Sequence, residues 1–77
     1  MQKSGAGRLR RSAWWLDGQQ TYALEDAYGR LRMYATAQPG VNLEPYLNRN
    51  VELFGSIVYR GYPPVYHIKA MQVAPVQ

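Results

Sequence analysis

The stretch NLEPYLNRN, residues 42–50, decides the fold of this 77-residue chain. Its large apolar residues recur at intervals of three and four, the spacing of one helical face, at Leu43, Tyr46 and Leu47. Pro45 fits the first turn of a helix, where its missing N–H costs nothing. The stretch therefore predicts one short helical turn over residues 43–48, and Asn48 or Asn50 suits the left-handed conformation that ends a helix.

Before this turn, apolar and polar residues alternate with a period of two, which predicts strands. The apolar run AWWL (13–16) stops at Asp17-Gly18, and Asp-Gly between apolar runs is a strong hairpin signal. TYALED (21–26) alternates, and GRLRMYATA (29–37) alternates for eight residues. We therefore expect a three-stranded meander before the helical turn.

After the turn, two further strands are predicted. The first is VELFGSIVYR (51–60), in which the mid-strand Gly55 indicates a bulge or a close backbone approach. The second is VYHIKAMQV (65–73), on which His67 is expected to face outward. The connection between them contains two consecutive prolines and is expected to be a stiff turn.

Five strands with a helical turn between the third and the fourth match one small all-β plan. This plan is the OB-fold, a five-stranded Greek-key barrel. The alternative is a Src-homology-type small barrel, which puts its helical turn between strands four and five. The place of the helical turn favours an OB-like barrel, formed as a single domain over residues 13–75.

The residues before the first predicted strand, 1–12, are rich in Gly, Ser and Arg and have no apolar run. We expect them to form a disordered basic leader. The chain has nine Lys and Arg against five Asp and Glu, and four of the nine lie in this leader, at Lys3, Arg8, Arg10 and Arg11. The predicted barrel is then nearly neutral, which weakens an argument for nucleic-acid binding from net charge alone.

The sequence predicts no enzyme. It contains one histidine and no cysteine, and its carboxylates lie mostly at expected turns and strand edges, so no nucleophile with a base is visible. No metal site and no cofactor are expected. No apolar run approaches the length of a membrane span, so no membrane insertion is expected either. Composition leaves the compartment unknown.

Binding is the function class that the predicted fold favours. OB barrels bind oligonucleotides or oligosaccharides on the face of strands two and three, beside the loops that join strands 1–2 and 4–5. Arginines interleaved with aromatic residues suit single-stranded nucleic acid, because rings stack on bases while arginines contact phosphates. The alternatives are a cell-wall carbohydrate ligand or an ordinary solvated strand face. The candidate binding face comprises Arg30, Arg32, Tyr34, Arg60, Tyr62 and Tyr66.

The partner that we expect first is protein, either a second copy or a neighbouring domain, with single-stranded nucleic acid and glycan as the alternatives. Apolar residues fall on both faces of the fourth predicted strand, and alternation sends one of the two consecutive tryptophans outward. A small barrel fills only one face, so the other set needs cover from the same chain, a second copy or a neighbouring domain. The candidate assembly surface comprises Trp14, Trp15, Phe54 and Val58.

From Tyr22 to Val73 the chain resembles a small uncharacterised domain of planctomycete bacteria, found in multidomain proteins. The resemblance is carried by Gly29, Pro39-Gly40, Asn42-Leu43, Tyr46, the strand from Val51, Gly55 and the string YRGY at 59–62. The chain is also similar to a broader bacterial OB pattern, with Asn48 where that pattern usually has Gly. The resemblance implies a non-catalytic binding or assembly module of a larger, envelope-associated or secreted protein, and it brings no assigned chemistry.

Overall fold

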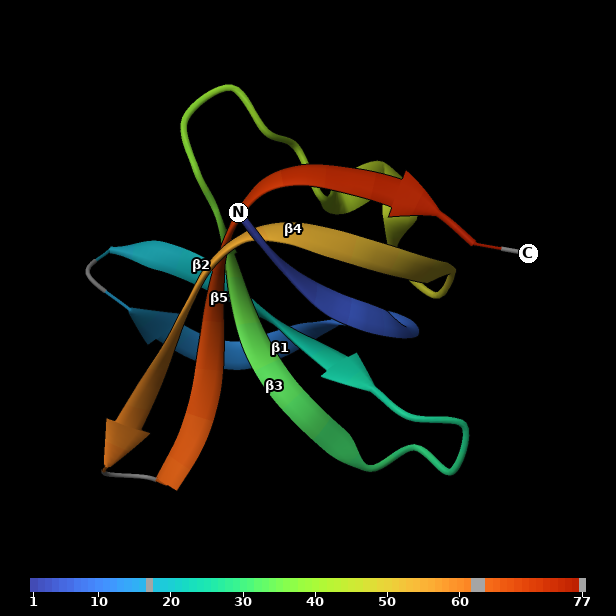
Figure 1. Ribbon diagram of the computed structural model, residues 1–77, viewed down its shortest axis with the longest axis horizontal. Helices are drawn as coiled ribbons and strands as arrows, with labels where there is room; N and C mark the ends of the chain where they lie inside the picture. The colour runs from blue at the N-terminus through green and yellow to red at the C-terminus, as the bar shows by residue number, and fades with distance from the viewer. Residues whose placement is uncertain (17, 62–63, 77) are drawn as a thin grey trace.

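The computed structural model describes residues 1–16, 18–61 and 64–76, and its strands form a closed barrel (Figure 1). The elements are β1 (Gln2–Leu16), β2 (Gln19–Glu25), β3 (Leu31–Ala37), the 3-10 helix η1 (Glu44–Tyr46), β4 (Asn50–Gly61) and β5 (Pro64–Pro75). Neighbours around the barrel follow the order β1-β2-β3-β5-β4, with β3 and β5 parallel and the other pairs antiparallel. The predicted OB-like barrel, with its helical turn between the third and fourth strands, is confirmed.

The helical turn is shorter than the predicted range 43–48, because Leu47 already has extended backbone (φ −60°, ψ 138°). Asn48 takes the left-handed conformation at φ 64°, as expected. Leu43 just before η1 is fully buried, and Leu47 packs against the core. The two leucines that flank η1 therefore place apolar side chains against the barrel interior. No helix in the described part of the chain is long and apolar enough to cross a membrane.

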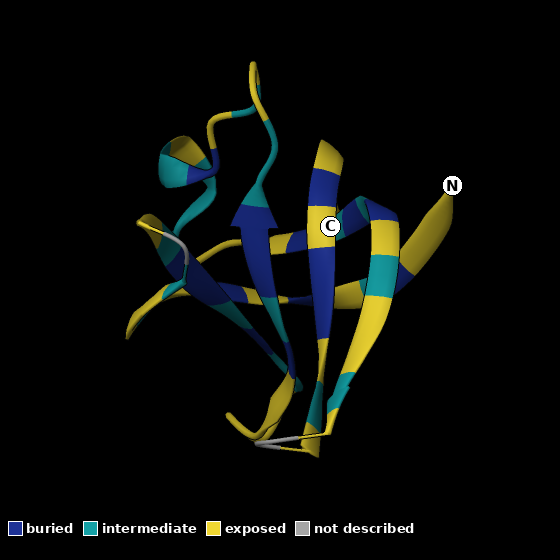
Figure 2. Ribbon diagram, turned by 90° about the vertical axis from the view of Figure 1, so that its left-hand side faces the viewer, coloured by how far each residue is buried: buried dark blue, intermediate teal, exposed yellow. Residues whose placement is uncertain are grey.

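The core lies inside the barrel, and Figure 2 shows its buried segments in dark blue. It consists of Leu9, Tyr22, Leu24, Met33, Ala35, Leu43, Val51, Leu53, Ile68 and Ala70. These residues come from all five strands and from the segment before η1. Alternation with a period of two turns one side of each strand inward and leaves the other side for the outer surface.

The prediction of a disordered leader over residues 1–12 is wrong, and the domain does not begin at residue 13. Gln2–Leu16 forms β1, whose first half pairs with β4 and whose second half pairs with β2. Its buried positions include Ser4 and Gly7 before Leu9. Because these inward positions hold small or polar residues, apolar and polar residues do not alternate here, and alternation could not predict this part of the strand.

A bulge between Lys3 and Ala6 bends the first half of β1. Gly5 takes a positive φ of 78° there, and the backbone N–H of Leu53 donates to Ser4 Oγ (2.9 Å). The Arg32 guanidinium, from the start of β3, donates to the backbone carbonyl of Ser4 (3.1 Å) and to that of Ala6. Arg32 therefore links the bulge of β1 to β3 by hydrogen bonds.

The β4–β5 hairpin is longer than predicted. Its register continues to Gly61 opposite Pro64, which is the first residue of β5, a position where a strand tolerates proline. The hairpin projects from the barrel toward the lower left of Figure 1. Gly55 lies at the bulge where the register shifts, and a Cβ added to it would lie 1.9 Å from the Lys69 carbonyl oxygen. The predicted close approach at Gly55 is confirmed.

Candidate ligand-binding face

One row of cross-strand neighbours runs around the outside of the barrel. The register aligns Arg10 with Ala23, Ala23 with Tyr34, Tyr34 with His67, and His67 with Val58. We call these five residues the outer row. Because successive side chains of a strand point to opposite faces, the row lies opposite core residues such as Leu24 and Ile68.

A small pocket of about 100 Å³ opens beside the outer row, and we call it the aromatic pocket. It is lined by Trp14, Leu16, Thr21, Tyr34, Arg60, Val65 and His67. These residues come from the ends of the β1–β2 and β4–β5 hairpins and from β3 between them. Both hairpins extend toward the left-hand side of Figure 1.

Two aromatic rings form one wall of the aromatic pocket. The rings of Trp14 and Tyr34 stack with centroids 5.8 Å apart and planes inclined by 27°. Trp14 remains 53% exposed, so the pair presents ring surface to solvent. The backbone position of Trp14 is supported by Thr21, whose hydroxyl donates to the Trp14 carbonyl (2.8 Å). The pocket thus has an aromatic wall fixed by a buried threonine.

His67 lines this pocket, and it lies on the outward face of its strand as predicted, yet it is not solvated. It is on the outer row but only 3% exposed. Its Nε2 is 2.9 Å from Thr36 Oγ1, and its Nδ1 is 3.5 Å from Arg60 Nη2. Both ring nitrogens of His67 thus face polar side chains inside the protein.

The predicted binding residues do not all meet. Tyr34 and Arg60 share the aromatic pocket, joined there by Trp14 from the predicted assembly surface. Arg32 instead contacts the backbone of β1, and Arg30 is exposed at the β2–β3 turn. Tyr62 lies outside the described residues.

The remaining aromatic candidates lie away from the aromatic pocket. Tyr66 faces away from it, because it is the strand neighbour of the pocket residue His67. Its ring packs edge-on against the Tyr59 ring with centroids 5.2 Å apart, and both rings are exposed. Trp15 is 65% exposed and does not line the pocket, while Phe54 is partly buried on β4.

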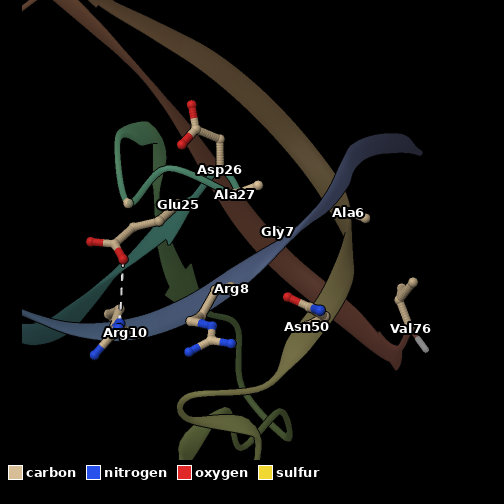
Figure 3. Close-up of a pocket in the computed structure, with 10 residues that line it drawn as sticks. Ala6, Gly7, Arg8, Arg10, Glu25, Asp26, Ala27, Asn50 and Val76 are labelled. Atoms are coloured by element: carbon tan, nitrogen blue, oxygen red, sulfur yellow. Dashed lines mark ion pairs between the residues drawn. The ribbon is translucent and has the colours of Figure 1, made fainter.

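A second, wider hollow of about 550 Å³ lies at the bend of β1 (Figure 3). Charged residues of both signs line it, and Arg10 Nε is 3.3 Å from Glu25 Oε1. Asp26 Oδ1 accepts the backbone N–H groups of Tyr28 and Arg30, so this carboxylate holds the β2–β3 turn. The two acids are thus engaged within the protein, and Arg8 stays exposed at the wall.

A third polar cluster joins η1 to the strands. The Tyr22 hydroxyl donates to Glu44 Oε2, and Arg11 forms an ion pair with Glu44 Oε1. Burial, reinforced by the hydrogen bond to Glu44, raises the pKa of Tyr22 to about 12. The hydrogen bonds from Tyr22 and then from Arg11 lower the pKa of Glu44. Each group is thereby held in its ordinary ionisation state at neutral pH, which suits a structural link.

Across residues 1–16, 18–61 and 64–76, no three His, Cys, Asp or Glu side chains gather as a metal site would require. Comparison of the chain with family models, with curated proteins and with solved structures gave no match in any of the three. The resemblance to a planctomycete domain therefore stays a prediction, and the face must be interpreted from its own chemistry.

Proposed function

We propose that this chain is a non-catalytic binding module that binds single-stranded nucleic acid on the outer row and the aromatic pocket. The observation that carries the proposal is the stacked pair of Trp14 and Tyr34 with the arginines Arg10 and Arg60 on the same face. The pair lies where OB barrels bind oligonucleotides, beside strands two and three and between the 1–2 and 4–5 hairpins.

Stacking is the main contribution expected from this face. A base that stacks on an exposed protein ring contributes about 1–3 kcal/mol, whatever its sequence, because every base has a π-face. Trp14 and Tyr34 already hold a common orientation, so little side-chain freedom is lost when a base stacks on them. The face therefore suits successive bases of a flexible strand better than a base-paired helix.

The position of the basic residues supports the same ligand class. Lys3, Arg8, Arg10 and Arg11 belong to β1, so their charge lies on the barrel wall instead of on a tail. Arg10 is in the outer row two strands from Tyr34, and Arg8 is exposed two residues earlier on the same strand. Phosphates that follow a base stacked on Tyr34 would meet these guanidinium groups.

Anisotropy of a labelled, mixed-sequence DNA strand of about eight nucleotides tests the proposal. The protein should bind it, and binding should weaken as salt rises from about 50 to 200 mM. Trp14→Ala should weaken binding by about 5- to 150-fold. The matched control is Trp15→Ala, because Trp15 is an adjacent exposed tryptophan that does not line the pocket. Absence of binding at low salt, or equal loss in the two variants, would overturn the proposal.

A second function, association with protein, is supported by the exposed aromatic pair Tyr59–Tyr66 on the β4–β5 hairpin. Exposed apolar side chains that cluster on one projecting element are typical of interaction surfaces. Sedimentation at micromolar concentration should then show a dimer that the double change Tyr59→Ser and Tyr66→Ser removes. A monomer for the unchanged protein would rule out self-association.

A further inference from the structure

Arg60 has hydrogen-bonding capacity that the described part of the chain leaves unused. Its side chain lines the aromatic pocket, and Nη2 is within 3.5 Å of His67 Nδ1. Its Nε is shielded from solvent and has no hydrogen-bond partner within the described ranges of the chain. A guanidinium carries five N–H donors and no acceptor, and buried donors are ordinarily paired. Arg60 is therefore suited to a ligand that supplies acceptors.

The threonine and the histidine that line the pocket are already engaged. Thr21 Oγ1 donates to the Trp14 carbonyl, and Thr36 Oγ1 pairs with His67 Nε2. The remaining lining is apolar or aromatic, from Leu16, Val65 and the stacked rings. The pocket thus offers a ligand a flat aromatic wall, which carries the Trp14 indole N–H and the Tyr34 hydroxyl, and the charged donors of one guanidinium. The Arg60 side chain has four torsions with which to reorient.

We infer, on the basis of the proposed function, that the aromatic pocket takes one base of the strand and that Arg60 makes it select guanine. Guanine presents two adjacent acceptors, O6 and N7, which match the two parallel N–H groups of a guanidinium. Its two fused rings also offer more stacking surface to Trp14 and Tyr34 than a single ring does.

The other bases lack one of these two properties. Adenine has two fused rings, but its amino donor stands beside N7 and would face the guanidinium donors. Cytosine has adjacent acceptors at N3 and O2 but only one ring. Thymine has one ring and no adjacent pair of acceptors. The pocket should therefore bind guanine more tightly than the other three bases. Two properties contribute to this preference, the size of the ring system and the pattern of acceptors, and they can be tested separately.

The test uses strands of about eight nucleotides that are all thymine except for one central base. The unchanged protein should bind the strand with guanine about 5- to 150-fold more tightly than the strand with adenine. Replacing guanine by 7-deazaguanine, which keeps the rings and removes the N7 acceptor, should abolish most of that preference. Arg60→Lys should do the same, because an ammonium cannot make the paired contact.

Arg49→Lys is the matched control, because Arg49 is exposed beside η1 and lies outside the pocket, and it should keep the guanine preference. Thermal unfolding of both variants separates altered recognition from altered folding. Equal binding of all four strands would overturn the guanine inference and leave the proposed function standing. A preference that survives Arg60→Lys would overturn the role of Arg60. Binding of none of the strands would overturn the proposed function and this inference with it.

Discussion

Leu9→Ala tests whether β1 is an integral part of the barrel. Leu9 is fully buried and pairs with Leu24 across β1 and β2. Replacing a buried leucine by alanine costs about 2–5 kcal/mol, through lost burial and the cavity that remains. A domain of this length has a free energy of unfolding of about 4–12 kcal/mol, so the variant should lose a large part of its stability.

Urea unfolding followed by tryptophan fluorescence measures this loss. With a slope of about 1–1.5 kcal/mol per molar urea, the midpoint should fall by roughly 1–5 M. Leu9→Val removes a single methylene and should cost about 1 kcal/mol, which keeps the test readable if the alanine variant does not fold. Arg8→Ala is the control, since Arg8 is the exposed neighbour on the same strand and should change stability by less than about 0.5 kcal/mol.

A result in which Leu9→Ala unfolds at the same urea concentration as Arg8→Ala would refute this reasoning. It would mean that the segment before residue 13 makes no packed contact. The barrel would then be closed without the first half of β1, and the basic residues of that segment would no longer lie on its wall.

Gly55→Ala should destabilise the protein by about 1–3 kcal/mol or more, because the new Cβ would meet the Lys69 carbonyl at 1.9 Å. The control is Gly61→Ala, which should cost little because no described atom lies within 4 Å of its new Cβ. Equal urea midpoints for the two variants would contradict this prediction. The raised pKa of Tyr22 contributes stability that is present below pH 10 and is lost as pH rises toward 12. Tyr22→Phe should therefore flatten the fall in unfolding free energy over that range, and parallel curves would count against the Tyr22–Glu44 bond. The lowered pKa of Glu44 contributes stability that is present above its ordinary value of 4.5 and is lost as pH falls through the lowered value, so Glu44→Gln should flatten the acid side of the same curve.

The barrel could be predicted because two local signals agree with the tertiary structure. Alternation marked four of the strands, and the three- and four-residue spacing of Leu43, Tyr46 and Leu47 placed the helical turn between the third and fourth. Gly55 also signalled its close contact from its position alone. Most of β1 was not predicted, because its first inward positions are Ser4 and Gly7 instead of large apolar residues. Ser4 is buried with its hydroxyl accepting the Leu53 N–H, and Gly7 is buried because it has no side chain.

The candidate site could be predicted only in part, because its geometry depends on two hairpins that meet in space. Tyr34 and Arg60 were proposed as binding residues and Trp14 as an assembly residue, and no sequence pattern indicates that the three share a pocket. The alternation of β5 predicts that His67 faces outward, which is confirmed, but it does not predict that His67 is buried. Its burial comes from neighbours on other strands, among them Thr36 on β3 and Arg60 on β4, which is a tertiary effect. The alternation of β3 put Arg32 on the right face, but its partner, the bulge of β1, was not foreseen.

The double pairing of β1 has a consequence for how the chain folds. Gln2 pairs with Gly55, and β3 pairs in parallel with β5, so the two closures of the ring join segments far apart in sequence. On a ribosome the first half of β1 must wait until β4 has emerged, while β2 and β3 can pair as soon as they are made. Contacts of this range slow the search for the native state, and refolding should take milliseconds to seconds. During that interval the first half of β1 exposes an unpaired strand edge, where the positive charges of Lys3 and Arg8 discourage aggregation.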